Sequence, residues 1–174
     1  VLGGRRGHSA DEGDGLEDLA EGGSPDTLVE EYSGKMGVKS AVGEAGTGPI
    51  GIGMGAGLKR SFMITTDSAH PYFSMATMLI DTNDCFGGFN FVEPKHGMVL
   101  YSPGYDSGTE VNDESCNNIP GPGCANLGDQ IGTDFNADGE GYIHIHRGIH
   151  GVGDLDESVS DWRNPVLKIE ITRV

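Results

Sequence analysis

The chain has 174 residues, and its 27 Asp and Glu against 11 Lys and Arg give a formal net charge of −16. This charge repels nucleic-acid phosphates and anionic lipid surfaces, so we expect neither as a partner. The length fits one domain with its own core, and no apolar run approaches the roughly 20 residues that cross a bilayer. The composition therefore predicts one acidic domain without a transmembrane segment, suited to hard cations and protein partners.

The N-terminal third is predicted to contain short helices and flexible connections. Residues 1–15, rich in Gly, Arg and Asp, predict an extended acidic arm. An amphipathic pattern begins at Leu16, and Ser24-Pro25-Asp26 provides a cap and a proline that favour a second helix. Seven glycines between residues 43 and 57 indicate a connector. We therefore expect residues 16–57 to form two short helices followed by a Gly-rich connector.

Residues 58–174 are predicted to form the folded body of the domain. Apolar runs of strand length are separated by Gly, Pro, Asn and Asp turns, and in the last run Leu167, Ile169 and Ile171 alternate with polar residues. Without long intervening helices, this pattern predicts a mainly β fold, an antiparallel β-sandwich. The expected strands are Ser61–Thr65, Tyr72–Ile80, Met98–Ser102, Tyr142–His146 and Val166–Val174.

The three cysteines bear on the compartment. Cys116 and Cys124 enclose a Pro/Gly loop with little core of its own, which favours a disulfide and an oxidising environment. Zinc is the competing interpretation, although the two residues are too far apart for a C-x₂₋₄-C arm. Cys85 lies in an apolar context, so we expect it to be a buried free thiol.

Several phrases resemble, in order, the spondin N-terminal (F-spondin) domain family, particularly its single-domain microbial and algal members. The resemblance covers roughly residues 16–174, and its most specific phrases are Asp106-Ser-Gly-Thr-Glu110 and Trp162-Arg-Asn-Pro165. The supporting phrases are Leu16–Glu21, Phe73–Ile80 leading into Asn83-Asp84, His146–Gly151 and Gly153-Asp154-Leu155. The resemblance implies a C2-like β-sandwich that binds calcium in its end loops, with a role in adhesion and no catalytic activity.

Transfer of the family's acidic residues gives the main calcium site. Asp84 ends the first strand phrase, and Asp106 and Glu110 belong to the Asp-x-Gly-Thr-Glu phrase, so the resemblance implies that these three are calcium ligands. Ca²⁺ takes six to eight oxygens, which acidic loops at the end of a sandwich can supply. The alternative is that Asp84 and Asp106 cap turns by accepting hydrogen bonds from backbone N–H groups.

Two further clusters are candidate metal sites. Asp134, Asn136 and Asp138 match the first half of an EF-hand loop, but Ile145 occupies the position of the bidentate Glu. We expect either a looser second calcium site, with Glu140 as a further donor, or a solvated acidic turn.

The histidines offer another chemistry. His144 and His146 would share one face of a strand, and His150 follows after a turn. Three histidines leaving a position open for water is the arrangement of hydrolytic zinc, and a hydrogen-bonded pair beside Asp154 is the alternative.

The sequence thus favours a calcium-binding, non-catalytic adhesion or protein-interaction module. We expect it in an extracellular or other non-cytosolic compartment: secreted, periplasmic or in an organelle lumen. One alternative is an accessory structural subunit of a larger complex, including one associated with a membrane, in which the acidic N-terminal third lies across a basic partner surface and the sandwich is a rigid anchor. The second alternative is a metal-dependent hydrolase built on the three histidines.

Overall fold

The computed structural model describes residues 15–39, 59–121, 123–124 and 139–174. Most of the expected N-terminal arm and Gly-rich connector lies outside these residues, as does the acidic segment around Asn136. The elements are α1 (Gly15–Gly22), α2 (Asp26–Tyr32), β1 (Phe73–Met78), β2 (Cys85–Val92), β3 (Val99–Ser102), β4 (Gly104–Asp106), β5 (His144–Ile145), α3 (Glu157–Ser160) and β6 (Leu167–Glu170).

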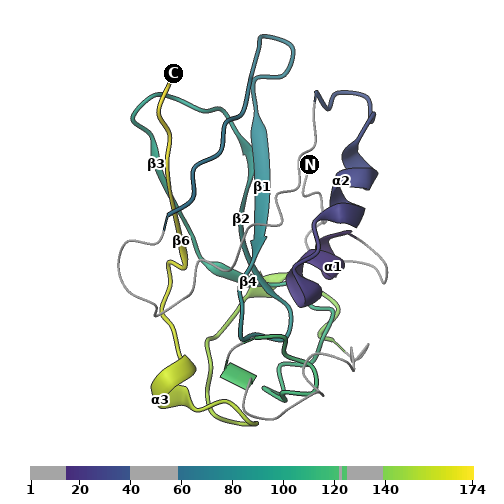
Figure 1. Ribbon diagram of the computed structural model, residues 1–174, viewed down its shortest axis with the longest axis vertical. Coiled ribbons are helices and arrows are strands. Elements are labelled where there is room, and N and C mark those ends of the chain that lie inside the picture. Colours follow the sequence, from purple (N-terminus) through teal and green to yellow (C-terminus); the bar gives the residue numbers. More distant parts are fainter. Residues whose placement is uncertain (1–14, 40–58, 122, 125–138) are drawn as a thin grey trace.

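The strands form two antiparallel sheets, one of four strands in the order β1-β2-β4-β5 and one of two, β3-β6 (Figure 1). The sheets approach each other at Gly87, where an added Cβ would lie 3.5 Å from Leu167 Cβ. The expected mainly β fold with antiparallel sheets is therefore confirmed. Its assignment as a C2-like sandwich stays a prediction.

The two N-terminal helices lie beside β1, on the side away from β3 and β6 (Figure 1). Helix α1 turns Leu16 and Ala20 toward Phe86 of β2, and Ala76, Tyr105 and Ile143 surround this small core. The backbone N–H of Gly15 donates to Glu31 Oε1 at 2.7 Å, which fastens the start of α1 to α2. The helices expected here are confirmed, because the apolar spacing that predicted α1 is the face it buries.

A second core lies at the end of the molecule where α3 and the long loops gather (Figure 1). Its buried members are Leu79, Cys85, Cys116, Ile119, Cys124, Ile149, Leu155 and Trp162, with Val166 packed against them. Several of these residues come from loops, so this end has little regular secondary structure to satisfy its backbone groups. Among the helices in the described part of the chain, none has the length and apolar character needed to cross a bilayer.

The expected strand at Ser61–Thr65 is wrong. Residues 59–72 form no strand, and Phe62, Met63 and Ile64 are 53%, 79% and 45% exposed. Apolar β-formers make a strand only where a neighbour pairs with them and one face is covered.

The opposite error concerns β2, for which no strand was expected. Its two central glycines lower β-propensity, yet a Cβ on Gly88 would lie only 2.6 Å from Met75 O of the paired strand. The close approach of β1 therefore requires glycine at position 88, and glycine is the residue type that made β2 look unlike a strand in the sequence.

Candidate functional site

The site is built where β2 begins and β4 ends. The register of the two strands places Cys85 opposite Asp106, so Asp84 lies next to the residues that follow β4. Both carboxylates have no exposed surface, although aspartate is almost never fully buried without a partner. The strand pairing thus brings together two of the three acidic residues that the sequence singled out for calcium.

Asp84 organises the loop that contains the Asp-x-Gly-Thr-Glu phrase. Its Oδ2 accepts hydrogen bonds from Ser107 Oγ at 2.8 Å, from the Thr109 backbone N–H at 2.8 Å and from the Glu110 backbone N–H at 3.2 Å. These bonds agree with the turn-capping interpretation. Its other oxygen, Oδ1, is buried and has no hydrogen-bond partner in the described part of the chain. One oxygen of Asp84 therefore holds the loop, and the other keeps its full capacity to bind a positive group.

Asp106 is held by the turn that it begins. Its Oδ1 accepts from the Gly108 backbone N–H at 2.8 Å, and its Oδ2 accepts from Asn112 Nδ2 at 2.5 Å. Gly108 has a φ of +77°, a conformation that side chains with a Cβ rarely adopt. The pKa of Asp106 is raised to about 7, first by burial and then by the neighbouring charge of Asp84, against the opposing effect of the hydrogen bond from Asn112.

The pKa of Asp84 is also raised, first by burial, while its hydrogen bonds to the loop lower it and the charge of Glu140 raises it. Ionisation of both carboxylates is thus energetically disfavoured, and a bound cation would remove this disadvantage.

Glu140 and His144 join Asp106 from the other side. Among the described residues, these three form the one group of His, Cys, Asp or Glu whose candidate ligand atoms all lie within 4.8 Å of one another. His144 Nδ1 lies 3.5 Å from Asp106 Oδ1, and Asn112 Nδ2 also donates to Glu140 Oε1 at 3.0 Å. Asp84, Asp106 and Glu110 form no such group, so the ligand atoms of the three expected calcium ligands do not all lie within that distance of one another in the absence of an ion.

The position of Glu140 depends on a tight backbone contact. The Gly141 N–H donates to Gly108 O at 2.9 Å, and a Cβ on Gly139 would lie 2.2 Å from that same oxygen. Only glycine allows this approach. We expected Glu140 to accompany Asp134, Asn136 and Asp138, but that segment lies outside the described residues, so the second calcium site stays a prediction.

A further acid from α1 lies close to this site. Glu21 is buried, and its pKa is raised to about 7, first by this burial and also by the charges of Glu17, Asp84 and Asp18, against the effect of a hydrogen bond with Thr109. Thr109 also bonds Asp84, so the helix and the acidic loop share one hydroxyl. Neither Glu21 nor Asn112 was predicted to be a site residue. Glu21 had one signal, since it ends the Leu16–Glu21 phrase of the family resemblance.

The histidines are not brought together. His146 is buried against Trp162, with ring centroids 5.2 Å apart, and its Nδ1 accepts from the Gly148 N–H at 3.0 Å. Burial lowers the pKa of His146 to about 4. His150 is exposed and uses its backbone N–H to donate to Glu114 Oε1. Of the three, His144 alone joins the group around Asp106, so the arrangement expected for a three-histidine zinc site is not formed.

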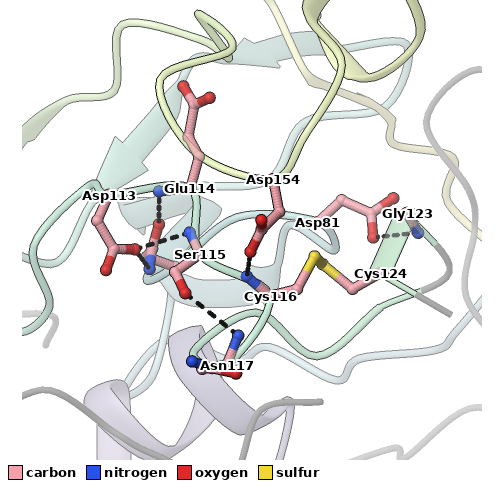
Figure 2. The surroundings of a disulfide bond; sticks show 10 residues. Asp81, Asp113, Glu114, Ser115, Cys116, Asn117, Gly123, Cys124 and Asp154 are labelled. Carbon is pink, nitrogen blue, oxygen red and sulfur yellow. Dashed lines mark hydrogen bonds between the residues drawn. A yellow bond between two sulfur atoms is a disulfide. The ribbon is translucent and has the colours of Figure 1, made fainter. Parts of the chain in front are cut away.

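The disulfide closes the loop between Cys116 and Cys124, as expected (Figure 2). Cys85 is a buried free thiol, also as expected. Figure 2 shows carboxylates around the disulfide that accept backbone N–H groups: Asp154 Oδ2 from Cys116 at 3.0 Å and Asp81 Oδ1 from Gly123 at 2.8 Å. These acids hold irregular backbone in place of a strand ladder, so they are structural.

Glu114 has the same role for a neighbouring loop. At a φ of +56°, it accepts through Oε1 from the His150 N–H at 2.6 Å and through Oε2 from the Val152 N–H at 2.8 Å. Both of its oxygens are therefore used, in contrast to those of Asp84.

No known family model, characterised protein or solved structure matches this chain, so its interpretation rests on its own residues and geometry.

Proposed function

We propose that this chain is a non-catalytic, calcium-binding module that contacts a protein partner, in the manner implied by its resemblance to the spondin N-terminal domain family. The ion would be held by the loops that begin at Asp84 and Asp106, with Glu110 as the third acidic donor. In this role Ca²⁺ would join the ends of two strands and fix the loop between them.

The observation that carries the proposal is the buried Asp84 carboxylate with an unpaired oxygen beside a second buried carboxylate, Asp106. A buried polar atom without a partner is rare in folded proteins and calls for an explanation such as an ion. Hard oxygen donors are the ligands that Ca²⁺ prefers, and further oxygens from backbone or water complete its shell.

Charge balance supports the same conclusion. The charges that act most strongly on Asp106 are those of Asp84, Glu140 and His144, and none of these is a permanent cation. Buried charges are ordinarily paired or coordinated to a metal. A divalent ion would therefore supply the positive charge that Asp84 and Asp106 lack.

The protein-interaction part of the proposal follows from the resemblance and the compartment. A disulfide forms and persists in oxidising surroundings, which supports a secreted, periplasmic or luminal location. The net charge of −16 favours a partner with a basic surface. A pull-down from native material should recover a partner in the presence of Ca²⁺ and lose it in EDTA. Recovery that is independent of Ca²⁺ would contradict a calcium-dependent contact.

Calorimetric titration tests the calcium site directly. We expect metal-free protein to bind Ca²⁺, and we expect Asp106→Asn to weaken binding because the ligand charge falls while the side-chain shape is kept. The matched control is Asp156→Asn, at the exposed N-cap of α3, where asparagine caps equally well. Absence of binding to the unaltered chain, or equal affinity in the two variants, would refute the proposed site.

A further inference from the structure

His144 gives this end of the molecule a ligand that calcium does not need. Calcium sites are built from oxygens, whereas imidazole nitrogen suits zinc, copper, iron and nickel. The ligand atoms of His144, Asp106 and Glu140 all lie within 4.8 Å of one another, and His144 Nδ1 is 3.5 Å from Asp106 Oδ1. Ligands on a tetrahedral zinc, at bond lengths of about 2.1 Å, are about 3.4 Å apart. The distance between His144 and Asp106 is therefore already close to that between two ligands of a bound metal.

We propose that Asp106, Glu140 and His144 form a second metal site, which takes a transition-series divalent cation such as Zn²⁺ and shares Asp106 with the calcium site. Asp106 contributes a buried carboxylate at the centre, while Glu140 is exposed and His144 partly exposed. This leaves an open side for water or for a donor from a partner protein. The two sites share Asp106, but Glu140 and His144 lie outside the main calcium set and group with Asp106 without bound Ca²⁺, so this proposal does not rest on the proposed function.

The amide of Asn112 is a second, separate indication. Its Nδ2 bridges the carboxylates of Asp106 and Glu140, whereas its Oδ1 is buried with no hydrogen-bond partner in the described part of the chain. The Nδ2 hydrogens of Asn112 thus lie between the carboxylates of Asp106 and Glu140 and place a partial positive charge there. Rotation of the amide by half a turn would aim Oδ1 into that space, where a cation would give it the partner it lacks.

The site is also rigid on both sides. Asp106 ends β4 and pairs with His144 of β5 in the sheet register, so the two ligands belong to adjacent strands. Glu140 is positioned by the contact of Gly139 and Gly141 with Gly108. Ligands fixed by sheet pairing and a close backbone contact lose little freedom when a metal binds.

The test uses the full chain without a histidine tag, stripped of metal and then saturated with Ca²⁺, and titrated with Co²⁺ as a spectroscopic probe and with Zn²⁺ as its competitor. We expect one Co²⁺ per chain, displaced by Zn²⁺. His144→Gln should lower the Co²⁺ affinity at least about tenfold, since even residues that only hydrogen-bond to a metal's ligands contribute about 10- to 100-fold. The matched control, His150→Gln, removes an exposed histidine outside the group and should leave the affinity unchanged.

Calcium titrations of the same variants separate this inference from the proposed function. His144→Gln should bind Ca²⁺ as the unaltered chain does. If the chain binds Ca²⁺ but takes no Co²⁺, or if His144→Gln binds Co²⁺ normally, the site of Asp106, Glu140 and His144 is refuted and the calcium site stands. If Co²⁺ binds through His144 but Ca²⁺ does not bind, the calcium site is refuted instead. Displacement of Co²⁺ by Ca²⁺ would show a single site and would also overturn the proposal.

Discussion

Asp106→Asn should have opposite effects on stability with and without metal. In the metal-free protein the pKa of Asp106 is raised from 3.8 to about 7. The native state therefore binds this proton more tightly than the unfolded state does. Between pH 3.8 and about 7 the unfolded state holds fewer protons, so the free energy of unfolding falls as pH rises. At pH 8 the whole disadvantage of burying the ionised carboxylate is present.

The size of that disadvantage decides whether Asp106→Asn raises or lowers the free energy of unfolding. The difference in pKa corresponds to about 4 kcal/mol at 1.36 kcal/mol per unit, which is an upper limit because Asp84 shares part of the repulsion. Asparagine removes the charge and keeps an acceptor for the Gly108 N–H, but it loses the bond from Asn112, a loss of about 1–3 kcal/mol. We therefore expect metal-free Asp106→Asn to be as stable as the unaltered chain at pH 8, or up to about 3 kcal/mol more stable.

Calcium should reverse the order. A ligand at 1,000 times its Kd adds about 4.1 kcal/mol to the native state, which exceeds the largest advantage of about 3 kcal/mol expected for the metal-free variant, and the variant should lose most of this gain because its site has one charge fewer. Urea denaturation at pH 5 and pH 8, in EDTA and in Ca²⁺, measures all four values, with Asp156→Asn as the control. If the Asp106→Asn variant is clearly less stable than the unaltered chain in EDTA at pH 8, Asp106 is not a strained acid and this reasoning fails.

Three further results are expected. Thiol titration of the denatured, non-reduced chain should find one reactive thiol, Cys85, and the folded chain should react slowly because that thiol is fully buried; three thiols would rule out the disulfide. Gly139→Ala should disturb the acidic loop and weaken metal binding, because the new methyl group meets backbone, whereas Gly22→Ala, with nothing within 4 Å, should not; equal metal affinities would contradict this. Asp138→Asn should weaken Ca²⁺ binding less than Asp106→Asn, as calorimetry can measure, and the reverse order would place the main site in the Asp138 segment.

The extent to which sequence predicted this molecule depended on whether local pattern and tertiary contact agreed. Helix α1 and strand β6 were foreseen because their apolar spacing is the face that they bury. The segment Ser61–Thr65 is an apolar run of strand length but has no partner strand, and the sequence pattern does not show whether a partner is present. The prediction missed strand β2 for the converse reason. Gly88 lowers the β-propensity of this segment, but its lack of a Cβ is what allows β1 to pack so closely.

The candidate site shows the same division. Asp84 and Asp106 were identified from their phrases, and the strand register places them together. The association of Asp106 with His144 depends on the pairing of β4 with β5, strands separated by more than 35 positions, and no local pattern contains it. Histidine spacing instead suggested a group with His146. His146 does not join this group, because its ring packs against Trp162 and its Nδ1 accepts a hydrogen bond from the Gly148 backbone N–H.

The distribution of acids explains why a metal would be placed at this end of the fold. The loops here lack a strand ladder, so carboxylates such as Glu114 and Asp154 accept their backbone N–H groups. This satisfies the backbone but brings many negative charges close to one another in a chain of net charge −16. The disulfide restrains the same loops without adding charge. A divalent cation at Asp84 and Asp106 would join the ends of two strands and lower the repulsion between their carboxylates. We therefore expect the stability of this end to depend on metal more steeply than that of the β3–β6 sheet, and hydrogen exchange with and without Ca²⁺ would distinguish the two.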